Sequence, residues 1–512
     1  MIIERSKNAA RNVFWGIFSK LLRLLAQFVI RVILVKSLGE AYLGLDSLFV
    51  SVISMLSLAE LGIGTALVFN MYKAIAEDDD EKICVLMLFY KKCYRIIGFA
   101  VLGIGLVLLP FIPKLVGSDL PDGINVYLLY CINLAGVLST YFLFAYRNCL
   151  IDAFQRSDVS SKTELFAGIV QYGSQIILLT ALKNYYVYLS VVPCVKILQN
   201  VLTAIVVGKK YPQFRPYGEL SAEFKKQIFT KVRALVTYKI GNVVSNSVDN
   251  IVISAALGLV VLAKYGNYYY VITTLFTLLQ IYYNAITAGI GNSVVVNSVE
   301  DNYKNFKTLL LMQTFICGFC TACLMSLYQD FITLWMGKDM LFDMSVVVCL
   351  AAYFYCWKIQ DVVNIYKDAL GMWEKDKWRP LISASVNLCL NIASVKFIGL
   401  YGIIGSTIFC SLFIDMPWGA KVLFKDYFKK ESGGYFLKIA LFSVFNAAAC
   451  ALCFFVCGFI PQSDVKIYAV LIFIGKGAIC FAVYSVLFIA AFFKTAEFKN
   501  VIGKIKNLIK RK

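Results

Sequence analysis

Apolar stretches long enough to cross a lipid bilayer recur along the whole chain, and no other feature restricts its fold as strongly. About 20 consecutive apolar residues span the ~30 Å hydrocarbon core as a helix. Because that core offers no water to backbone polar groups, such stretches must be helical. The chain is 60% hydrophobic and 16% charged, whereas soluble domains hold about half and a quarter. We therefore expect an all-α integral membrane protein.

The apolar stretches predict about fourteen membrane-spanning helices, of which six precede the first long loop, six follow it and two close the chain. The predicted spans lie near residues 11–36, 42–70, 84–113, 123–146, 163–183, 185–208, 233–257, 265–296, 308–336, 344–366, 380–397, 400–421, 435–459 and 465–493. The tail over 494–512 places apolar residues on one helical face and lysines on the other. It is expected either to lie on an anionic inner leaflet or to form a disordered basic tail.

The two sets of six helices look like copies of one unit. The stretch from Tyr146 matches the stretch from Tyr366, a shift of about 220 residues, and shorter matches recur at similar shifts. Six-helix copies enter the membrane from the same side, so we expect parallel repeats whose two lobes enclose a central cavity. The expected regions are a first lobe at 1–208, a cytoplasmic loop at 209–232, a second lobe at 233–430, two further helices at 431–493 and a basic cytoplasmic tail at 494–512.

The distribution of lysine and arginine sets the orientation. Most of the 50 basic residues fall on the side of the N-terminus, and the far-side loops carry one lysine each. By the positive-inside rule, both termini are predicted to be cytoplasmic. The net charge of +19 is thereby explained by membrane insertion, and no nucleic-acid partner is expected.

Histidine is absent from the sequence, which argues against histidine-based metal centres and proton relays. The 16 cysteines lie mostly inside apolar stretches, where a cysteine behaves as a small hydrophobic residue. The spacing of Cys317, Cys320 and Cys323 and the pair Cys450 and Cys453 therefore indicate helix packing rather than a metal or redox site. No cofactor and no enzymatic activity are expected.

Polar residues form one stripe along the first predicted helix. Its members follow helical spacing and are Asn12, Gly16, Lys20, Arg23, Gln27 and Arg31. An ionisable group in a membrane normally faces a cavity or a partner. In the second copy, the shift carries Lys20 onto Lys239, and polar residues continue at Asn242 and Asn246. A cationic central cavity is thus one interpretation, and structural ion pairs are the other.

Depth in the membrane helps to choose between these interpretations. Helices 1 and 2 are antiparallel, so Arg31 lies level with Asp46, and Lys20 lies level with Glu60. These two pairs are expected to be structural. Arg23 is left near the middle of the membrane without an obvious partner and is the strongest candidate for contacting a substrate.

Two further sets of polar residues are candidates. Helix 10 carries Lys358 together with Asp361, and Lys358 is assigned to the same cationic cavity. A sodium ion prefers oxygen ligands, and a candidate site for it combines Asp249, Asn387, Asn391 and Thr407. Because amides in membrane helices often join helix to helix, the ion site and the structural interpretation both stay open.

The segments SVDNIVISAALG from Ser247, KDALGMWEKDKWRPLISASVNL from Lys367 and GLYGIIGSTI from Gly399 resemble a known family. They are similar to the Wzx-like polysaccharide or oligosaccharide flippases of the MOP (multidrug/oligosaccharidyl-lipid/polysaccharide) exporter superfamily. The resemblance covers nearly the whole chain. It implies V-shaped MOP/MATE-like lobes and a location in the bacterial inner membrane. The implied activity moves an undecaprenyl-diphosphate-linked oligosaccharide to the outer leaflet.

The implied partners are the lipid-linked oligosaccharide, membrane lipids and other polysaccharide-assembly proteins, with coupling to Na⁺ or H⁺ as an option. A multidrug exporter of the same superfamily is the main alternative. A membrane glycan polymerase or ligase is a second alternative, although such enzymes carry a large outer loop and the far-side loops here are short.

Overall fold

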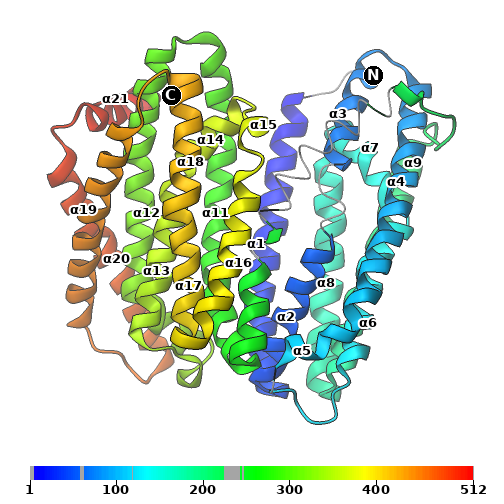
Figure 1. Ribbon diagram of the computed structural model, residues 1–512, viewed down its shortest axis with the longest axis horizontal. Coiled ribbons are helices and arrows are strands. Elements are labelled where there is room, and N and C mark those ends of the chain that lie inside the picture. The colour runs from blue at the N-terminus through cyan, green and yellow to red at the C-terminus, as the bar shows by residue number, and fades with distance from the viewer. Residues whose placement is uncertain are drawn as a thin grey trace. The chain divides into compact units, whose positions relative to one another are not determined.

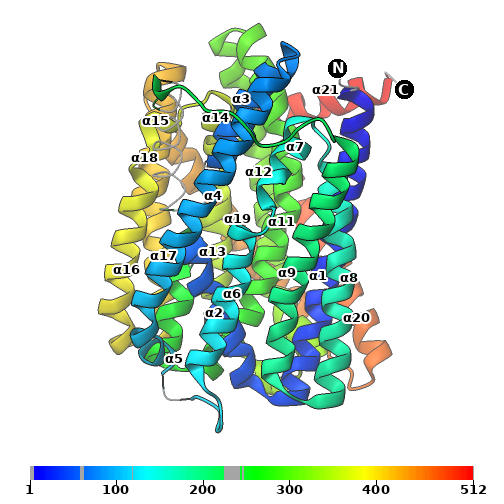
Figure 2. The same ribbon diagram turned by 90° about the vertical axis from the view of Figure 1, so that its right-hand side faces the viewer.

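A computed structural model describes residues 5–57, 63–117, 119–223, 226, 241, 243–244 and 247–510. All regular secondary structure in this part of the chain is helical. The chain divides into two compact units, Met1–Gly266 and Asn267–Lys512, here called unit 1 and unit 2. Within each unit the long helices run side by side (Figures 1 and 2).

Unit 1 contains long helices separated by short breaks. Its helices are α1 (Arg5–Leu38), α2 (Glu40–Leu56), α3 (Ile63–Ala76), α4 (Asp80–Leu108), η2 (Leu109–Phe111), α5 (Ile112–Val116), α6 (Val126–Phe142), η3 (Ala145–Arg147), α7 (Asn148–Ala153), α8 (Ser157–Leu182) and α9 (Tyr185–Lys210). A short apolar helix, Ser247–Leu257, follows before the start of α11 (Leu259–Val296). In this unit α1 packs mainly on α8, and α9 packs on both α6 and α8.

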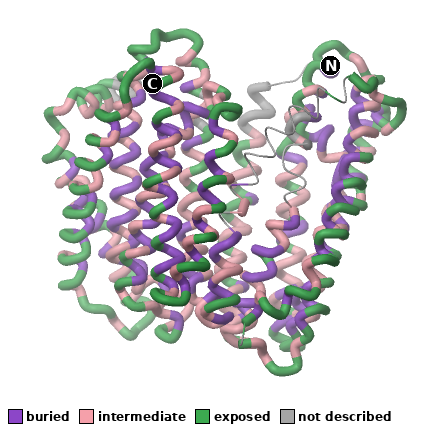
Figure 3. The backbone as a smooth tube through the Cα atoms, in the orientation of Figure 1, coloured by how far each residue is buried: buried purple, intermediate pink, exposed green. Residues whose placement is uncertain are grey.

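Unit 2 begins within α11 and is built around α12 (Val299–Trp335), which packs on α13, α19 and α20. Its other helices are η4 (Lys338–Met340), α13 (Met344–Ile359), α14 (Asp361–Ala369), α15 (Trp373–Asp376), α16 (Arg379–Ile398), α17 (Leu400–Cys410), η5 (Ser411–Asp415), α18 (Met416–Leu423), η6 (Phe424–Phe428), α19 (Gly433–Gly458), α20 (Lys466–Phe492) and α21 (Ala496–Lys510). Buried residues concentrate on the central helices of this unit (Figure 3).

The all-α membrane fold predicted from the sequence is confirmed. Among the described residues, 10 helices are long and apolar enough to cross a membrane, or up to 11 if the bent pair Val126–Phe142 and Ala145–Ala153 is one span. The polar α1 is not among them. The predicted count of about fourteen and the lobe boundaries at 209–232 stay predictions, because most of the segment between Lys226 and Ser247 lies outside the described residues.

Several spans are interrupted where the sequence predicts continuous helices. The span predicted over 123–146 is one of them, since α6 ends at Phe142 before a bend of 48°. Of the span predicted over 42–70, α2 and α3 are described, and residues 58–62 lie outside the described residues. The span predicted over 400–421 extends to Phe428 and contains two π-helical segments, η5 and η6. A π-helix widens the helix by one residue per turn and is frequent at functional sites.

Aromatic rings fill the core at one end of unit 2. Phe306 of α12 contacts Tyr366, Phe424, Phe428 and Tyr435, with ring centroids 5.3–6.1 Å apart. Such aromatic pairs stabilise beyond the area that they bury. These ring contacts pack α14, η6 and the start of α19 around the start of α12. Several polar groups of this unit described below lie on these packed helices.

Candidate functional site

The polar stripe of α1 faces α8 within unit 1. The Asn12 side-chain amide donates to the Gln155 carbonyl oxygen at 2.9 Å, and its oxygen accepts from the Asp158 backbone N–H at 2.8 Å. That second bond satisfies one of the N–H groups that every helix leaves unpaired at its start. Asn12 therefore has a structural role, which is to dock α1 on the first turn of α8.

Arg23 has an acidic partner on α8. Its guanidinium lies 2.9 Å from the Glu164 carboxylate, and the two side chains are 38% and 36% exposed. The expectation that Arg23 lacks an obvious partner is therefore wrong. One turn further along α1, Gln27 shares a hydrogen bond with Tyr172 of α8. Both polar side chains of α1 thus meet polar side chains at the α1–α8 seam, as burial in lipid requires.

A groove of about 260 Å³ runs beside this ion pair. Arg23 and Tyr172 line it almost entirely through their carbon atoms, so its wall is nearly all apolar. The apolar lining includes Leu22, Leu25, Ala26, Val29, Leu165 and Ile169. Because Leu25 and Ile169 are more than half exposed, the groove is open along one side. A single cation beside an open apolar wall matches the chemistry of an amphiphile with an anionic head.

The other predicted cations of α1 occupy different settings. Lys20 is exposed, and Arg31 interacts electrostatically with Asp46 of α2, the partner that helix depth predicts. Glu60, Lys239, Asn242 and Asn246 lie outside the described residues, so their assigned roles stay predictions.

In unit 2, Lys358 is buried and paired. Its ammonium lies 2.8 Å from Asp361 and 4.2 Å from the centre of the Phe276 ring. Gln313 of α12 donates to the Lys358 carbonyl and to the Tyr283 hydroxyl, both at 2.7 Å. Lys358 and Asp361 lie on either side of the break between α13 and α14. The ion pair and the amide therefore fix a point where the backbone departs from regular helix.

The residues assigned to a sodium site divide between the units. Asn387 of α16 donates to Thr407 of α17 at 2.9 Å, and Asn391 donates to the Asn387 oxygen at 3.2 Å. These bonds join α16 to α17, which agrees with the structural interpretation of the amides. Asp249 belongs to unit 1 and is buried there. No group of three or more acidic or cysteine side chains in the described ranges could hold a metal ion.

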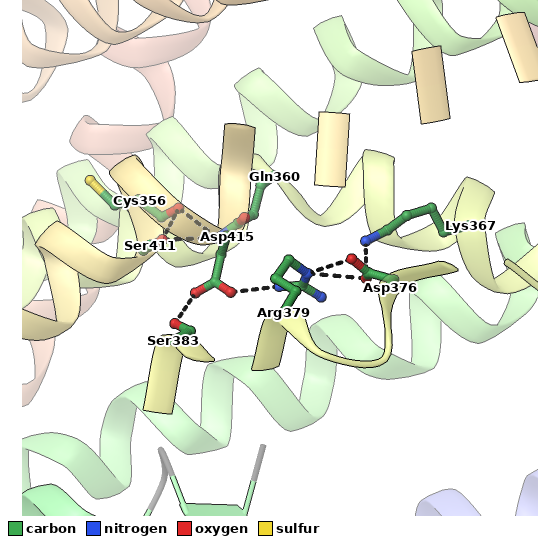
Figure 4. Close-up of polar contacts among 8 residues, drawn as sticks. All are labelled: Cys356, Gln360, Lys367, Asp376, Arg379, Ser383, Ser411 and Asp415. Atoms are coloured by element: carbon green, nitrogen blue, oxygen red, sulfur yellow. Dashed lines mark hydrogen bonds and ion pairs between the residues drawn. The ribbon is translucent and has the colours of Figure 1, made fainter. Parts of the chain in front are cut away.

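Four buried charges form a network in unit 2 that sequence reasoning missed (Figure 4). Lys367 of α14 donates to Asp376 at 2.5 Å, and Arg379 lies 2.9 Å from the same carboxylate. Arg379 also donates to Asp415 of η5 at 2.6 Å. All four side chains are at most 8% exposed. Two positive and two negative charges therefore cancel inside the helix bundle.

Neutral side chains extend this network to the break after α13. Ser383 donates to Asp415 at 2.8 Å. Gln360, between α13 and α14, donates to Ser411 of η5 at 2.8 Å, and Ser411 donates to the Cys356 carbonyl at 3.1 Å (Figure 4). The π-helical segment η5 thus receives hydrogen bonds and an ion pair from three neighbouring segments.

The sequence did carry a signal for the network. Lys367, Asp376, Arg379 and Ser383 all belong to the segment KDALGMWEKDKWRPLISASVNL, which also carries the family resemblance. Glu164 was missed for a different reason. Depth matching addressed only the consecutive helices 1 and 2, whereas the structure places α1 against α8.

Solved structures provide the comparison for this architecture. The chain is similar to "Lipid II flippase MurJ, inward closed conformation", with a TM-score of 0.66 and 16% identity over 94% of this chain and 100% of that chain. It is also similar to an inward-facing "multidrug resistance MATE family transporter of the MOP superfamily", with a TM-score of 0.58 and 15% identity over 78% of this chain and 93% of that chain. The chain has the MOP-superfamily fold.

A third similar structure is MATE in the bent conformation, with a TM-score of 0.51 and 15% identity over 86% of this chain and 97% of that chain. No protein-family model and no curated protein matches the chain. The MOP fold is thus common to this chain, a flippase and drug transporters. At these identities the Wzx-like branch stays a prediction.

Proposed function

We propose that this MOP-fold protein is a flippase that moves an undecaprenyl-diphosphate-linked oligosaccharide from the inner to the outer leaflet by alternating access. The observation that carries the proposal is the groove beside Arg23. A lipid-linked diphosphate needs both a cation for its head group and an apolar wall for its tail. The groove offers the apolar wall, and the guanidinium of Arg23, whose side chain is more than a third exposed, lies beside it.

The depth of Arg23 supports a transported lipid rather than a resident one. Arg23 lies near the middle of α1, roughly 22–27 Å from either end. Ordinary lipid head groups do not occupy that depth. A cation at that depth costs a few kcal/mol. Binding the anionic head group of a substrate that crosses the membrane would explain why a cation is present there. A substrate that is itself a cation, as many drugs are, would be repelled.

In this mechanism Arg23 binds a phosphate of the head group, and Glu164 holds the guanidinium between transport cycles. Lys20, Gln27 and Arg31 of the same helix, and Lys239, Asn242 and Asn246 of the second lobe, are proposed to line the route. Lys358 can contribute only when Asp361 releases it. Na⁺ coupling through Asp249, Asn387, Asn391 and Thr407 is less well supported, because the amides already bond each other.

Two matched substitutions test the role of Arg23. Arg23→Gln should reduce flipping of a lipid-linked oligosaccharide in proteoliposomes more than tenfold, because the head group loses its cation. Glu164→Gln should retain flipping within about threefold, because Arg23 stays in place. Size-exclusion chromatography would establish that both variants stay folded.

The double variant Arg23→Gln/Glu164→Gln separates the proposal from a purely structural pair. If the pair only holds α1 to α8, removing both charges should restore the activity that Arg23→Gln loses. If Arg23 binds substrate, the double variant should stay inactive. Recovery in the double variant would contradict the proposal.

The multidrug alternative has a separate test. Cells lacking the protein should lose surface glycan and keep their susceptibility to cationic drugs. Increased drug susceptibility with normal surface glycan would favour an exporter of the same superfamily.

A further inference from the structure

A second groove, of about 720 Å³, lies on the surface of unit 2 along α18. Its apolar wall includes Ile382 of α16 and Phe413 of η5, which are 41% and 66% exposed. Trp418 of α18 also lines it. These side chains offer an apolar surface between α16 and the helix that carries η5 and α18.

One end of this groove is positively charged. Lys421 and Lys425 lie one helical turn apart, line the groove and are exposed. Neither lysine forms an ion pair with a residue in the described ranges. The acidic group beside them, Asp426, is already paired with Lys375 at 3.0 Å. Two lysines and one aspartate line the groove, and Lys375, which lies outside the lining, neutralises that aspartate, so the charges of Lys421 and Lys425 stay uncompensated.

The two π-helical segments shape the groove. Phe413 and Ile414 belong to η5, Lys425 and Asp426 belong to η6, and α18 between them provides the floor. Since a π-helical turn holds an extra residue, each segment shifts the side chains that follow it around the helix. The irregular backbone thereby brings the apolar wall and the lysines onto one surface.

Depth distinguishes this groove from the one beside Arg23. Lys421 and Lys425 lie within roughly 10 Å of the end of the span Leu400–Phe428, which is the depth of lipid phosphates. The lysine distribution predicts that this end is cytoplasmic. Tryptophan is also enriched at that depth, where Trp418 lines the groove. The charge, the apolar wall and the depth all match a lipid of the leaflet itself.

We propose that this groove is a binding site for an anionic phospholipid of the cytoplasmic leaflet. Lys421 and Lys425 contact the phosphate, and an acyl chain lies along Ile382, Phe413 and Trp418. The bound lipid covers the irregular part of the helix that carries η5 and η6. This inference is independent of the proposed transport substrate, because it concerns a lipid that stays in its leaflet.

The test uses the full-length protein in detergent micelles, with fluorescent phosphatidylglycerol as the probe and phosphatidylcholine as the comparison lipid. Removing a lysine near an anionic head group weakens binding about fivefold. Lys421→Gln/Lys425→Gln should therefore weaken phosphatidylglycerol binding on the order of 20-fold and leave phosphatidylcholine binding unchanged. Lys396→Gln/Lys466→Gln removes the same charge at the opposite end of unit 2 and should have little effect.

A second measurement locates the lipid. Brominated phosphatidylglycerol should quench Trp418, and Trp418→Phe should remove that part of the quenching. Equal phosphatidylglycerol binding by the Lys421→Gln/Lys425→Gln variant and the native protein would overturn the proposal. Displacement of the probe by undecaprenyl diphosphate at a far lower concentration than by unlabelled phosphatidylglycerol would also overturn it, because the groove would then belong to the transport route.

Discussion

Arg23, Lys358 and Arg379 each contact a carboxylate of a neighbouring turn or helix. An unpaired charge removed from water costs several kcal/mol, so pairing is the expected state at rest. The pairs differ in exposure. The Lys358 and Arg379 pairs are almost fully buried, whereas Arg23 and Glu164 are more than a third exposed. Arg23 is therefore the cation of the three that a ligand can reach without unpacking the helices.

Asp376 lies between two cations in the buried network, so its charge is the one whose removal should do most damage. Asp376→Asn would leave Lys367 and Arg379 facing each other with one fewer compensating charge. Removing one partner of a buried pair costs about 3–5 kcal/mol. We expect a clear loss of thermal stability in detergent, measured by the unfolding temperature.

Glu374→Gln provides the matched control for that substitution. Glu374 is paired with Lys377 in the same short segment, but its side chain is 66% exposed. An exposed pair contributes about 0–1 kcal/mol, so this variant should unfold within a degree or two of the native protein. Equal destabilisation by both substitutions would mean that burial of the network does not determine its contribution.

Residue-level prediction from sequence was most direct where the two partners lie on consecutive helices. Arg31 and Asp46 are an example, because a short turn fixes which residues share a depth, and the two groups interact electrostatically. It failed for Arg23, since its partner Glu164 lies four spans later and becomes a neighbour only through packing of α1 on α8. The network around Arg379 was missed because its short helix α15 was not expected.

At the scale of helices, the packing of α12 against α19 and α20 requires a glycine at one position. Gly318 of α12 lies against Tyr484 of α20 and Asn446 of α19, and a Cβ atom at this position would overlap both side chains. Tyr484 and Asn446 are hydrogen-bonded to each other and buried, so they cannot move aside cheaply.

Gly318→Ala should therefore destabilise the protein by about 1–3 kcal/mol, as overpacking of a close-packed interior does. Thermal unfolding in detergent would measure the loss. Gly475→Ala in α20 is the control, because nothing lies within 4 Å of the added atom. That variant should be neutral or slightly more stable, since alanine favours helix over glycine.

The helix α21 is attached to unit 2 through an ion pair. Lys438 of α19 donates to Glu497 at 2.6 Å. Burial alone would raise the pKa of Glu497, but the hydrogen bond from Lys438 and nearby positive charges outweigh it and lower the pKa. A carboxylate with a lowered pKa stabilises the folded state above its ordinary pKa, and that contribution is lost as pH falls through the lowered value.

Amide exchange over residues 496–503 should therefore be slow near neutral pH and become faster, relative to the intrinsic rate, as pH falls below the ordinary carboxyl pKa of 4.5 and through the lowered pKa of Glu497. Glu497→Gln should remove this pH-dependent step and leave exchange in α20 unchanged. A step that persists in the variant would assign it to another group.

The positions of most helices were predictable from apolar length, but their interruptions were not. The break at Gln360 and the segment η6 have no proline within them, whereas Pro417 follows η5 by two residues and cannot donate a hydrogen bond to the Phe413 carbonyl. Side chains from neighbouring helices form hydrogen bonds to these irregular segments and stabilise them. Such tertiary contacts cannot be predicted from the sequence of one segment. The α1 start and the α12 start also extend further than predicted, since their first turns are polar.

For the whole molecule, the sequence indicated an all-helical membrane protein of the MOP type, and the similarity to solved MOP structures agrees with that fold. The predicted repeat rests on sequence matches at similar shifts, and the predicted orientation rests on the distribution of lysine and arginine. The proposed substrate rests on the family resemblance. The second lobe's predicted cations could not be placed, because Lys239 and its neighbours lie outside the described residues.

The buried network of unit 2 has a consequence for how the protein responds to voltage. Its two positive and two negative charges cancel, as do those of the Lys358 and Arg23 pairs. Moving one net charge through 100 mV involves about 2.3 kcal/mol of electrical work, but a neutral cluster that moves as a body involves almost none. Movement of these paired groups should therefore contribute almost nothing to voltage dependence. Voltage dependence of transport would report the charge of the cargo together with that of cations outside these pairs, such as the exposed Lys20.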